Sequence, residues 1–306
     1  MELKIQEIWK KFSNKEVLRN ISFTATSGQV LGYLGRNGAG KTTTIRILMD
    51  IFRPDSGKIL LNGTELHQKG RSKVSIGYLP EERGLYPRTK ISDQMIYIGE
   101  LRGMTRAAAK KSAMALLEEL EATEYWSKKL DNLSKGNQQK IQLAISVLHN
   151  PDIIILDEPF SGLDPVNSNI LKRLILKEVN AGKIVLFSSH QMPYVEEFCE
   201  HICIINQGEI VVNGKISDIK RSYPRNRLVI APERNAEEFD KLIAGNSLIA
   251  TSEIKGDEIE LTLKNPEDKA ELFRILAGLP IGFDKLHVVE PTLEEIFVEK
   301  TGDLNA

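Results

Sequence analysis

The chain reads Val30-Leu31-Gly32-Tyr33-Leu34-Gly35-Arg36-Asn37-Gly38-Ala39-Gly40-Lys41-Thr42-Thr43 between residues 30 and 43. The first five residues form a short apolar run, which is typical of a buried strand in a parallel sheet. The residues from Gly35 to Thr42 match the pattern G-x-x-x-x-G-K-[ST], which binds phosphate where a strand turns into a helix. The sequence therefore predicts an α/β fold with a P-loop nucleotide site.

Each part of this loop has an expected role in holding a nucleotide. The glycines let backbone N–H groups turn toward the phosphates at the start of a helix, whose partial positive charge favours an anion. Lys41 is expected to reach the β- and γ-phosphates of ATP, and the Thr42 hydroxyl to bind Mg²⁺. A fortuitous glycine turn is the alternative. The predicted ATP-binding residues of the loop are Gly35, Arg36, Asn37, Gly38, Ala39, Gly40, Lys41, Thr42 and Thr43.

Length and composition limit the classes of protein that fit. With 306 residues, the chain is about twice as long as a typical domain, so we expect two domains. It has 41 Lys and Arg residues against 42 Asp and Glu residues, a balance that argues against a nucleic-acid partner. No stretch approaches the roughly 18 to 20 apolar residues of a membrane-spanning helix.

The two cysteines, Cys199 and Cys203, are too few for a disulfide framework. His190 and His201 lie near them in the sequence, so a metal site has to be considered. The spacing does not fit the common zinc patterns, because the segment resembles a helix end that leads into an apolar strand. We therefore interpret both cysteines as core residues.

The first domain is expected to hold the nucleotide site. Two apolar runs, Ile153–Leu156 and Ile184–Phe187, flank a helical segment, as in a parallel βαβ unit. Before them the pattern is helical, with Thr105 as an N-cap. We place this domain at residues 1–222, with a helical subdomain at about 82–149.

The second domain is predicted at residues 223–306. Its pattern reads strand, helix, strand, strand, helix and strand, which is the βαββαβ order of ferredoxin-like folds, followed by a last helix at Leu293–Lys300. Ile259, Leu261 and Leu263 alternate with polar residues, as in a sheet that has one face in water. We therefore expect a small α+β accessory domain.

Two carboxylates follow the apolar run that ends at Leu156. Asp157 is placed to hold Mg²⁺ through water, and Glu158 to activate the attacking water as a general base. On its own, such a pair after a strand is usually a solvated turn. Three further segments lie at fixed places around it, and they read Leu133-Ser134-Lys135-Gly136-Asn137-Gln138-Gln139, Ser161-Gly162-Leu163-Asp164 and Ser188-Ser189-His190.

With these segments in this order, residues 1 to about 220 resemble the ABC-transporter ATPase family. The resemblance implies that Ser134 and Gly136 contact the γ-phosphate of ATP bound to the other subunit of a head-to-tail dimer. It also implies that Asp164 organises the dimer interface and that His190 hydrogen-bonds the γ-phosphate and the attacking water. The adenine-stacking aromatic of the family maps onto Phe12, with Val17 alongside; a core role for Phe12 is the alternative.

Three features depart from the family pattern. Lys135 and Asn137 stand in a signature motif that reads LSGGQ in the family. Glu81 stands where the family has a glutamine; a carboxylate can still bind Mg²⁺ but adds negative charge near the phosphates. The accessory domain is no part of the basic cassette, and its end resembles the tail of ATPase subunits of bacterial ABC-2-type exporters.

The resemblance implies a homodimer at the cytoplasmic face of the cell membrane, where it drives separate transmembrane permease subunits. The run Pro80 to Tyr86, with the altered signature, is similar to ATPases described as sodium-export subunits. We therefore predict an ATP-hydrolysing exporter subunit whose cargo is sodium or a small toxic compound. A soluble regulatory ATPase of the same family, without coupling to transport, is the alternative.

Overall fold

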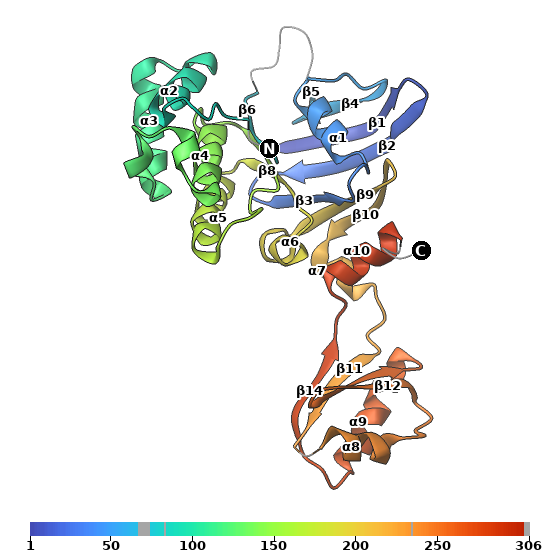
Figure 1. The fold of residues 1–306 in the computed structure, drawn as a ribbon. Helices are drawn as coiled ribbons and strands as arrows, with labels where there is room; N and C mark the ends of the chain where they lie inside the picture. Colours follow the sequence, from blue (N-terminus) through green and yellow to red (C-terminus); the bar gives the residue numbers. More distant parts are fainter. Residues whose placement is uncertain (67–73, 83, 234, 303–306) are drawn as a thin grey trace. The chain divides into compact units, whose positions relative to one another are not determined.

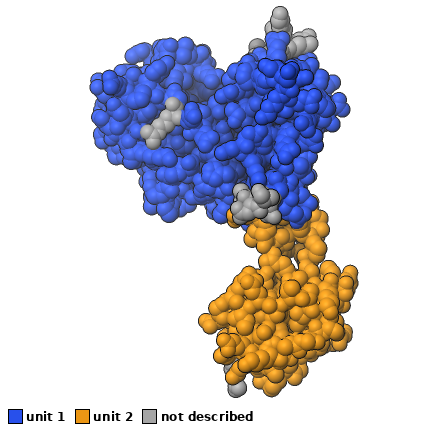
Figure 2. Space-filling model, turned by 45° about the vertical axis from the view of Figure 1, so that its right-hand side comes forward, with its two compact units in different colours: residues 1–216, 297–306 blue, residues 217–296 orange. Residues whose placement is uncertain are grey.

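A computed structural model describes residues 1–66, 74–82, 84–233 and 235–302 of the protein. The chain divides into two compact units, which Figure 2 shows in different colours. The first comprises Met1–Ile216 together with the segment that starts at Phe297, and the second comprises Ser217–Ile296. The sequence placed a boundary at residue 222 and gave the whole C-terminal segment to the second domain. The segment that starts at Phe297 instead packs with the first unit.

A six-stranded sheet forms the centre of the first unit (Figure 1). All its neighbouring strands are parallel except β10, which runs antiparallel to β9. The strands β3, β7 and β8 are buried along their whole length, which explains their unbroken apolar sequences. In spatial order the strands are β10 (Glu209–Lys215), β9 (His201–Asn206), β3 (Val30–Gly35), β8 (Ile184–Ser188), β7 (Ile153–Asp157) and β6 (Ile76–Leu79).

A second, antiparallel sheet shares its core with the first. Its strands are β1 (Glu2–Phe12), β2 (Lys15–Thr26), β4 (Ser56–Leu61) and β5 (Thr64–Glu65). Leu3 and Ile5 of β1 belong to one buried cluster with Ile45 of helix α1 (Lys41–Leu48) and Ile155 of β7. Because α1 packs in this shared core, the loop before it is held against both sheets.

The predicted helical subdomain is present beside β6, the edge strand of the parallel sheet (Figure 1). Thr105 caps α3 as expected, since its hydroxyl accepts a hydrogen bond from the backbone N–H of Ala108. Ile91, Met95 and Ile96 of helix α2 (Ile91–Leu101) are buried, so the apolar side chains of this helix belong mainly to the core. The helices that follow α1 in the first unit are α2 (Ile91–Leu101), α3 (Arg106–Glu119), α4 (Lys135–Val147), α5 (Pro165–Asn180) and α6 (Met192–Phe198). Helix α7 (Ile216–Arg221) begins at the last residue before the second unit.

The second unit has the ferredoxin-like order that the sequence predicts. Its strands lie in the order β12, β13, β11, β14, and all neighbours are antiparallel. Leu228 and Ile259 of the sheet pack against Phe239 of α8 and Leu272 of α9. The elements are β11 (Arg227–Pro232), α8 (Ala236–Ile243), β12 (Ile249–Lys255), β13 (Glu258–Leu263), α9 (Lys269–Ala277), β14 (Phe283–Val289) and α10 (Leu293–Thr301), the last of which runs from the second unit into the first.

Two exclusions made from the sequence can be compared with the structure. Cys199 and Cys203 are free and buried, and burial raises the pKa of both thiols. Within the described ranges, no group of three or more His, Cys, Asp or Glu side chains is arranged to hold a metal ion. None of the helices in the part of the chain that the structure describes is long and apolar enough to cross a membrane.

Candidate functional site

The phosphate-binding loop joins β3 to α1, as the sequence predicts. Gly38 and Gly40 both have positive φ, 80° and 120°, a region that glycine enters freely. A Cβ atom on Gly40 would lie 2.7 Å from Cδ2 of Leu18. The loop can therefore approach β2 closely and turn its backbone toward the start of α1 only with glycine at this position.

A cavity of about 680 Å³ opens above this loop. This volume suits a nucleotide-sized ligand. Glu81, Asp157, Glu158 and His190 reach it from the ends of β6, β7 and β8, which are the carboxyl ends of parallel strands. The cavity is lined by Val17, Gly35, Arg36, Asn37, Gly38, Gly40, Lys41, Thr42, Thr43, Glu81, Asp157, Glu158, His190 and Phe297.

Lys41 brings a positive charge to the bottom of the phosphate-binding loop. Its amine donates to the backbone carbonyls of Gly35, at 2.5 Å, and Arg36, at 3.3 Å. Burial lowers the pKa of Lys41, while the charges of Asp157, Glu158 and Glu81 raise it. The carbonyls that it contacts belong to the loop, so the amine lies where the phosphates of a nucleotide would be received.

Glu158 is the most firmly fixed carboxylate in the cavity. It is 6% exposed and has a φ of 51°, a backbone conformation that non-glycine residues rarely adopt and that clusters at active sites. One carboxylate oxygen accepts from the backbone N–H of His190 at 2.7 Å and lies 2.7 Å from the His190 ring nitrogen Nδ1; the other accepts from the Ser189 hydroxyl at 3.0 Å. The end of β8 therefore orients a carboxylate that follows β7.

Asp157 lies beside it in an electrostatically unfavourable place. It is 7% exposed, and burial raises its pKa, with the charges of Glu81 and Glu158 acting in the same direction. Burial and the charge of Asp157 also raise the pKa of Tyr78 to about 12. Three carboxylates against Lys41 and Arg36 leave an excess of negative charge in the lining, which a divalent cation would neutralise.

This donor set fits Mg²⁺ bound together with a nucleotide. Thr42, Asp157 and Glu81 offer a hydroxyl and two carboxylates in one cavity, and Mg²⁺ prefers oxygen ligands, with phosphates and water completing its octahedron. The side chains alone do not form a closed metal cage within the described residues. Magnesium would therefore enter with the phosphates, as it does in other P-loop proteins.

The signature residues lie away from this cavity. Ser134 is exposed and caps α4, where its hydroxyl accepts from the backbone N–H of Asn137. Gly136 is buried against Asn167, whose amide nitrogen would be 3.1 Å from a Cβ at this position. The side chain of Lys135, one of the departures from the family pattern, lies across Gly162. Asp164 caps α5 through Asn167.

The two residues expected around the adenine separate in the structure. Val17 lines the cavity, whereas Phe12 is not among its described lining residues. Phe12 is 38% exposed, and its ring meets that of Phe52 edge-on with the centroids 5.2 Å apart. The phenylalanine among the described lining residues is Phe297 in α10. Sequence reasoning missed it because no local motif connects the end of the chain with the loop.

Sequence reasoning also missed the role of Ser189, which appeared only as part of the Ser188-Ser189-His190 segment. Its hydroxyl donates to Glu158 and accepts from the backbone N–H of Gln191 at 3.1 Å. A polar residue directly after a buried strand was the only available signal. The structure places it as a support for the carboxylate of Glu158.

Comparisons with known proteins identify the family of the chain. Residues 18–161 match the family described as ABC transporter, and residues 214–301 match the family described as ATP-binding protein DrrA1-3-like, C-terminal domain. The chain is 40% identical to the ABC transporter ATP-binding protein YhaQ of Bacillus subtilis over 98% of both chains. It is 30% identical to the linearmycin resistance ATP-binding protein LnrL of the same organism, again over 98% of both.

A solved structure of an ATP-binding subunit of an ABC transporter is similar with a TM-score of 0.67 and 27% identity, over 72% of this chain and 93% of that one. The P-loop cassette predicted from the sequence is thus confirmed. The chain belongs to the ATP-binding subunits of ABC transporters.

Proposed function

We propose that the protein hydrolyses Mg²⁺-ATP, with Glu158 as the general base. The observation that carries the proposal is the fixed Glu158 carboxylate, which shares one cavity with Lys41 and Thr42 of the phosphate-binding loop. Hydrolysis of ATP needs charge stabilisation and a positioned water more than covalent chemistry. Lys41 supplies the charge, and His190 and Glu158 together orient the water. Asp157, with Thr42 and Glu81, holds the Mg²⁺ that neutralises the phosphates.

We further propose that the active form is a head-to-tail homodimer. Ser134, Gly136 and Asp164 are not among the described residues that line the cavity of their own chain. Ser134 is exposed at the start of α4, and the N-terminus of a helix favours an anion. Ser134 is therefore available to the γ-phosphate bound by a second copy, with Gly136 beside it in the chain and the exposed Asp164 left for the dimer interface. Two such copies would close two equivalent sites.

A membrane partner has a suitable surface on the helical subdomain. Tyr86, Tyr97 and Leu101 are between 54% and 67% exposed, although aromatic and leucine side chains are usually covered. Tyr97 and Leu101 lie on α2, and with Tyr86 they are the candidate docking residues for transmembrane permease subunits. Such a partner would hold the protein at the cytoplasmic face of the membrane.

The proposed direction of transport is export. The relatives include proteins named for linearmycin resistance and for Nod factor export, and each of those names refers to the relative alone. None of the relatives described here is named for sodium, so the proposal does not specify the cargo. A regulatory ATPase without a membrane partner remains the second candidate and would lack any effect of a permease on its hydrolysis rate.

The test uses two variants that should be inactive for different reasons. Lys41→Ala removes the phosphate contact, and Ser134→Arg blocks the signature surface. Phosphate release is measured for each variant and for their mixture. A mixed dimer has one site with an intact loop and an intact signature, so the mixture should recover a clear fraction of wild-type activity. If Ser134→Arg alone stays active, or if the mixture stays inactive, the dimeric site is wrong.

A further inference from the structure

The C-terminal helix α10 supplies one wall of the nucleotide cavity. The first unit includes the chain from Phe297 onward, and Phe297 lines the cavity together with the phosphate-binding loop. Among the described lining residues, Val17 and Phe297 have apolar side chains. The others are glycines or carry polar or charged groups. The cavity thus has a polar part for phosphates and a small apolar part.

A hydrogen bond ties the end of this helix to the phosphate-binding loop, and a second lies within the helix. The guanidinium of Arg36, in the phosphate-binding loop, donates to the backbone carbonyl of Gly302. The buried hydroxyl of Thr301 donates to the carbonyl of Phe297 at 2.7 Å. Phe297 therefore lies on a helical turn whose end is bonded to the loop that receives the phosphates.

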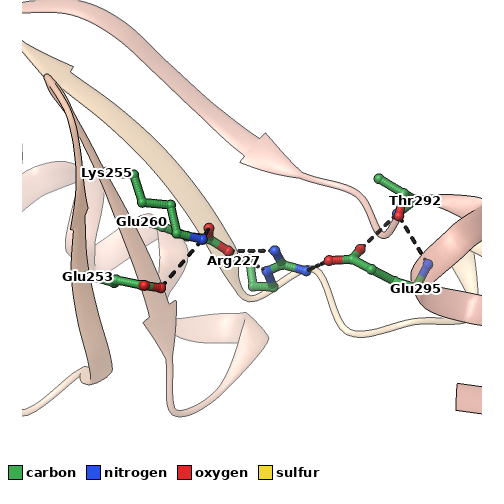
Figure 3. A network of polar contacts seen from close by, with 6 residues as sticks. All are labelled: Arg227, Glu253, Lys255, Glu260, Thr292 and Glu295. Carbon is green, nitrogen blue, oxygen red and sulfur yellow. Dashed lines mark hydrogen bonds and ion pairs between the residues drawn. The ribbon is translucent and has the colours of Figure 1, made fainter. Parts of the chain in front are cut away.

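Hydrogen bonds and ion pairs also hold the start of α10 within the second unit (Figure 3). Thr292 and Glu295 form a reciprocal capping box, in which each backbone N–H donates to the other side chain, at 2.9 and 3.1 Å. Arg227 donates to Glu295 at 2.7 Å and also pairs with Glu260, which in turn pairs with Lys255. Such a helix start is ordered rather than frayed, so the position of Phe297 along the helix is defined.

We infer that Phe297, together with Val17, contacts the base and ribose of ATP bound in its own chain. Aromatic side chains bind nucleobases by stacking, because every base has a π face. The polar lining is already matched to phosphates and Mg²⁺, which leaves the apolar part for the rest of the nucleotide. The inference rests on the proposed ATP site and adds a binding residue from outside the basic cassette.

The test compares two ligands that differ only in the part that Phe297 would contact. ATP and inorganic tripolyphosphate are each used to displace a fluorescent ATP analogue from wild type and from Phe297→Ala. We expect the affinity for ATP to fall about tenfold in the variant, within the range of base–aromatic stacking. The affinity for tripolyphosphate should stay unchanged, since the phosphate contacts are intact.

Three further variants make the result specific. Phe273→Ala, at a partly exposed phenylalanine of α9, is the matched control and should bind both ligands like wild type. Phe297→Tyr keeps an aromatic face and should retain most of the ATP affinity. Phe12→Ala tests the aromatic expected from the sequence under the same conditions.

The inference is overturned if Phe297→Ala binds ATP as tightly as wild type or more tightly, or if it loses tripolyphosphate equally. If Phe297→Ala does not fold, Phe297→Leu, which keeps the apolar volume, must still lose ATP affinity while keeping that for tripolyphosphate. Lys41→Ala shows whether a negative result for Phe297 means that Phe297 has no role or that the proposed ATP site is wrong. If Lys41→Ala also binds both ligands normally, the ATP site itself is wrong; if it loses both, only the role of Phe297 is refuted.

Discussion

Glu158→Gln should abolish hydrolysis while leaving the fold nearly unchanged. The carboxylate accepts hydrogen bonds from the backbone N–H of His190 and from the Ser189 hydroxyl. A glutamine keeps the first bond through its carbonyl oxygen. Its amide group can donate to the Ser189 oxygen, which already accepts from Gln191. The change in unfolding free energy should therefore be that of about one hydrogen bond, roughly 0.5–1.5 kcal/mol.

The effect on the rate should be much larger. A positioned general base contributes about 10²- to 10⁴-fold to a reaction, which corresponds to roughly 2.7–5.4 kcal/mol of activation free energy. Glutamine cannot accept the proton of the attacking water. Phosphate release is therefore expected to fall at least about a hundredfold, with the ATP affinity unchanged.

The assay combines steady-state phosphate release with light scattering in Mg²⁺-ATP and with thermal unfolding. Because ATP binds but is not cleaved, Glu158→Gln should also accumulate as a dimer. Glu65→Gln, at an exposed position of β5, is the control and should match wild type in all three measurements. A rate for Glu158→Gln within about tenfold of wild type would refute the assignment of Glu158 as the base.

Three more changes follow from the geometry of the cavity. The folded-state pKa of Asp157 lies above its unfolded value, so its contribution to stability is present below the usual Asp pKa of about 3.9 and is lost as the pH rises through the folded pKa. Asp157→Asn should therefore raise the melting temperature at pH 7 and lose this advantage in acid; an equal melting temperature at pH 7 contradicts the argument. Gly40→Ala should weaken ATP binding by about tenfold, because the new Cβ meets Leu18 in a backbone region of positive φ; Gly28→Ala, with a positive φ but open space around it, is the control, and comparable affinities in a nucleotide titration would be inconsistent with the steric reason. Glu81→Gln removes a charge that raises the pKa of Asp157. The acidic limb of the pH–rate profile should therefore move to lower pH at saturating Mg²⁺. A limb that does not move would show that Glu81 does not act on Asp157 in the metal site.

The parts of the fold that local patterns determine were predictable. β3 is an apolar run that ends at glycines, and β7 ends in two carboxylates, so both positions in the parallel sheet follow from sequence. The ferredoxin-like order of the second unit follows from its succession of strands and helices, and the alternation in β13 shows that one face of its sheet is buried. Such periodicity reports which face of an element is buried.

Contacts between distant segments were not predictable. Ile91 and Met95 recur at helical spacing, which does not say whether they face the core or a partner, and only packing shows that they are core residues. Phe297 lines the cavity although the phosphate-binding loop lies near the other end of the chain. The left-handed backbone of Glu158 also has no sequence signal, because its backbone N–H is held by the carbonyl of Ser188, which ends the distant strand β8.

The return of the chain's last segment to the first unit has a consequence for dissecting the protein. A chain cut after residue 216 keeps the phosphate-binding loop but loses Phe297 and the carbonyl of Gly302 that Arg36 contacts. This truncation therefore removes the second unit together with part of the first. Removing residues 217–296 and rejoining the two ends is a different deletion, and the two shortened chains should not be expected to bind nucleotide alike.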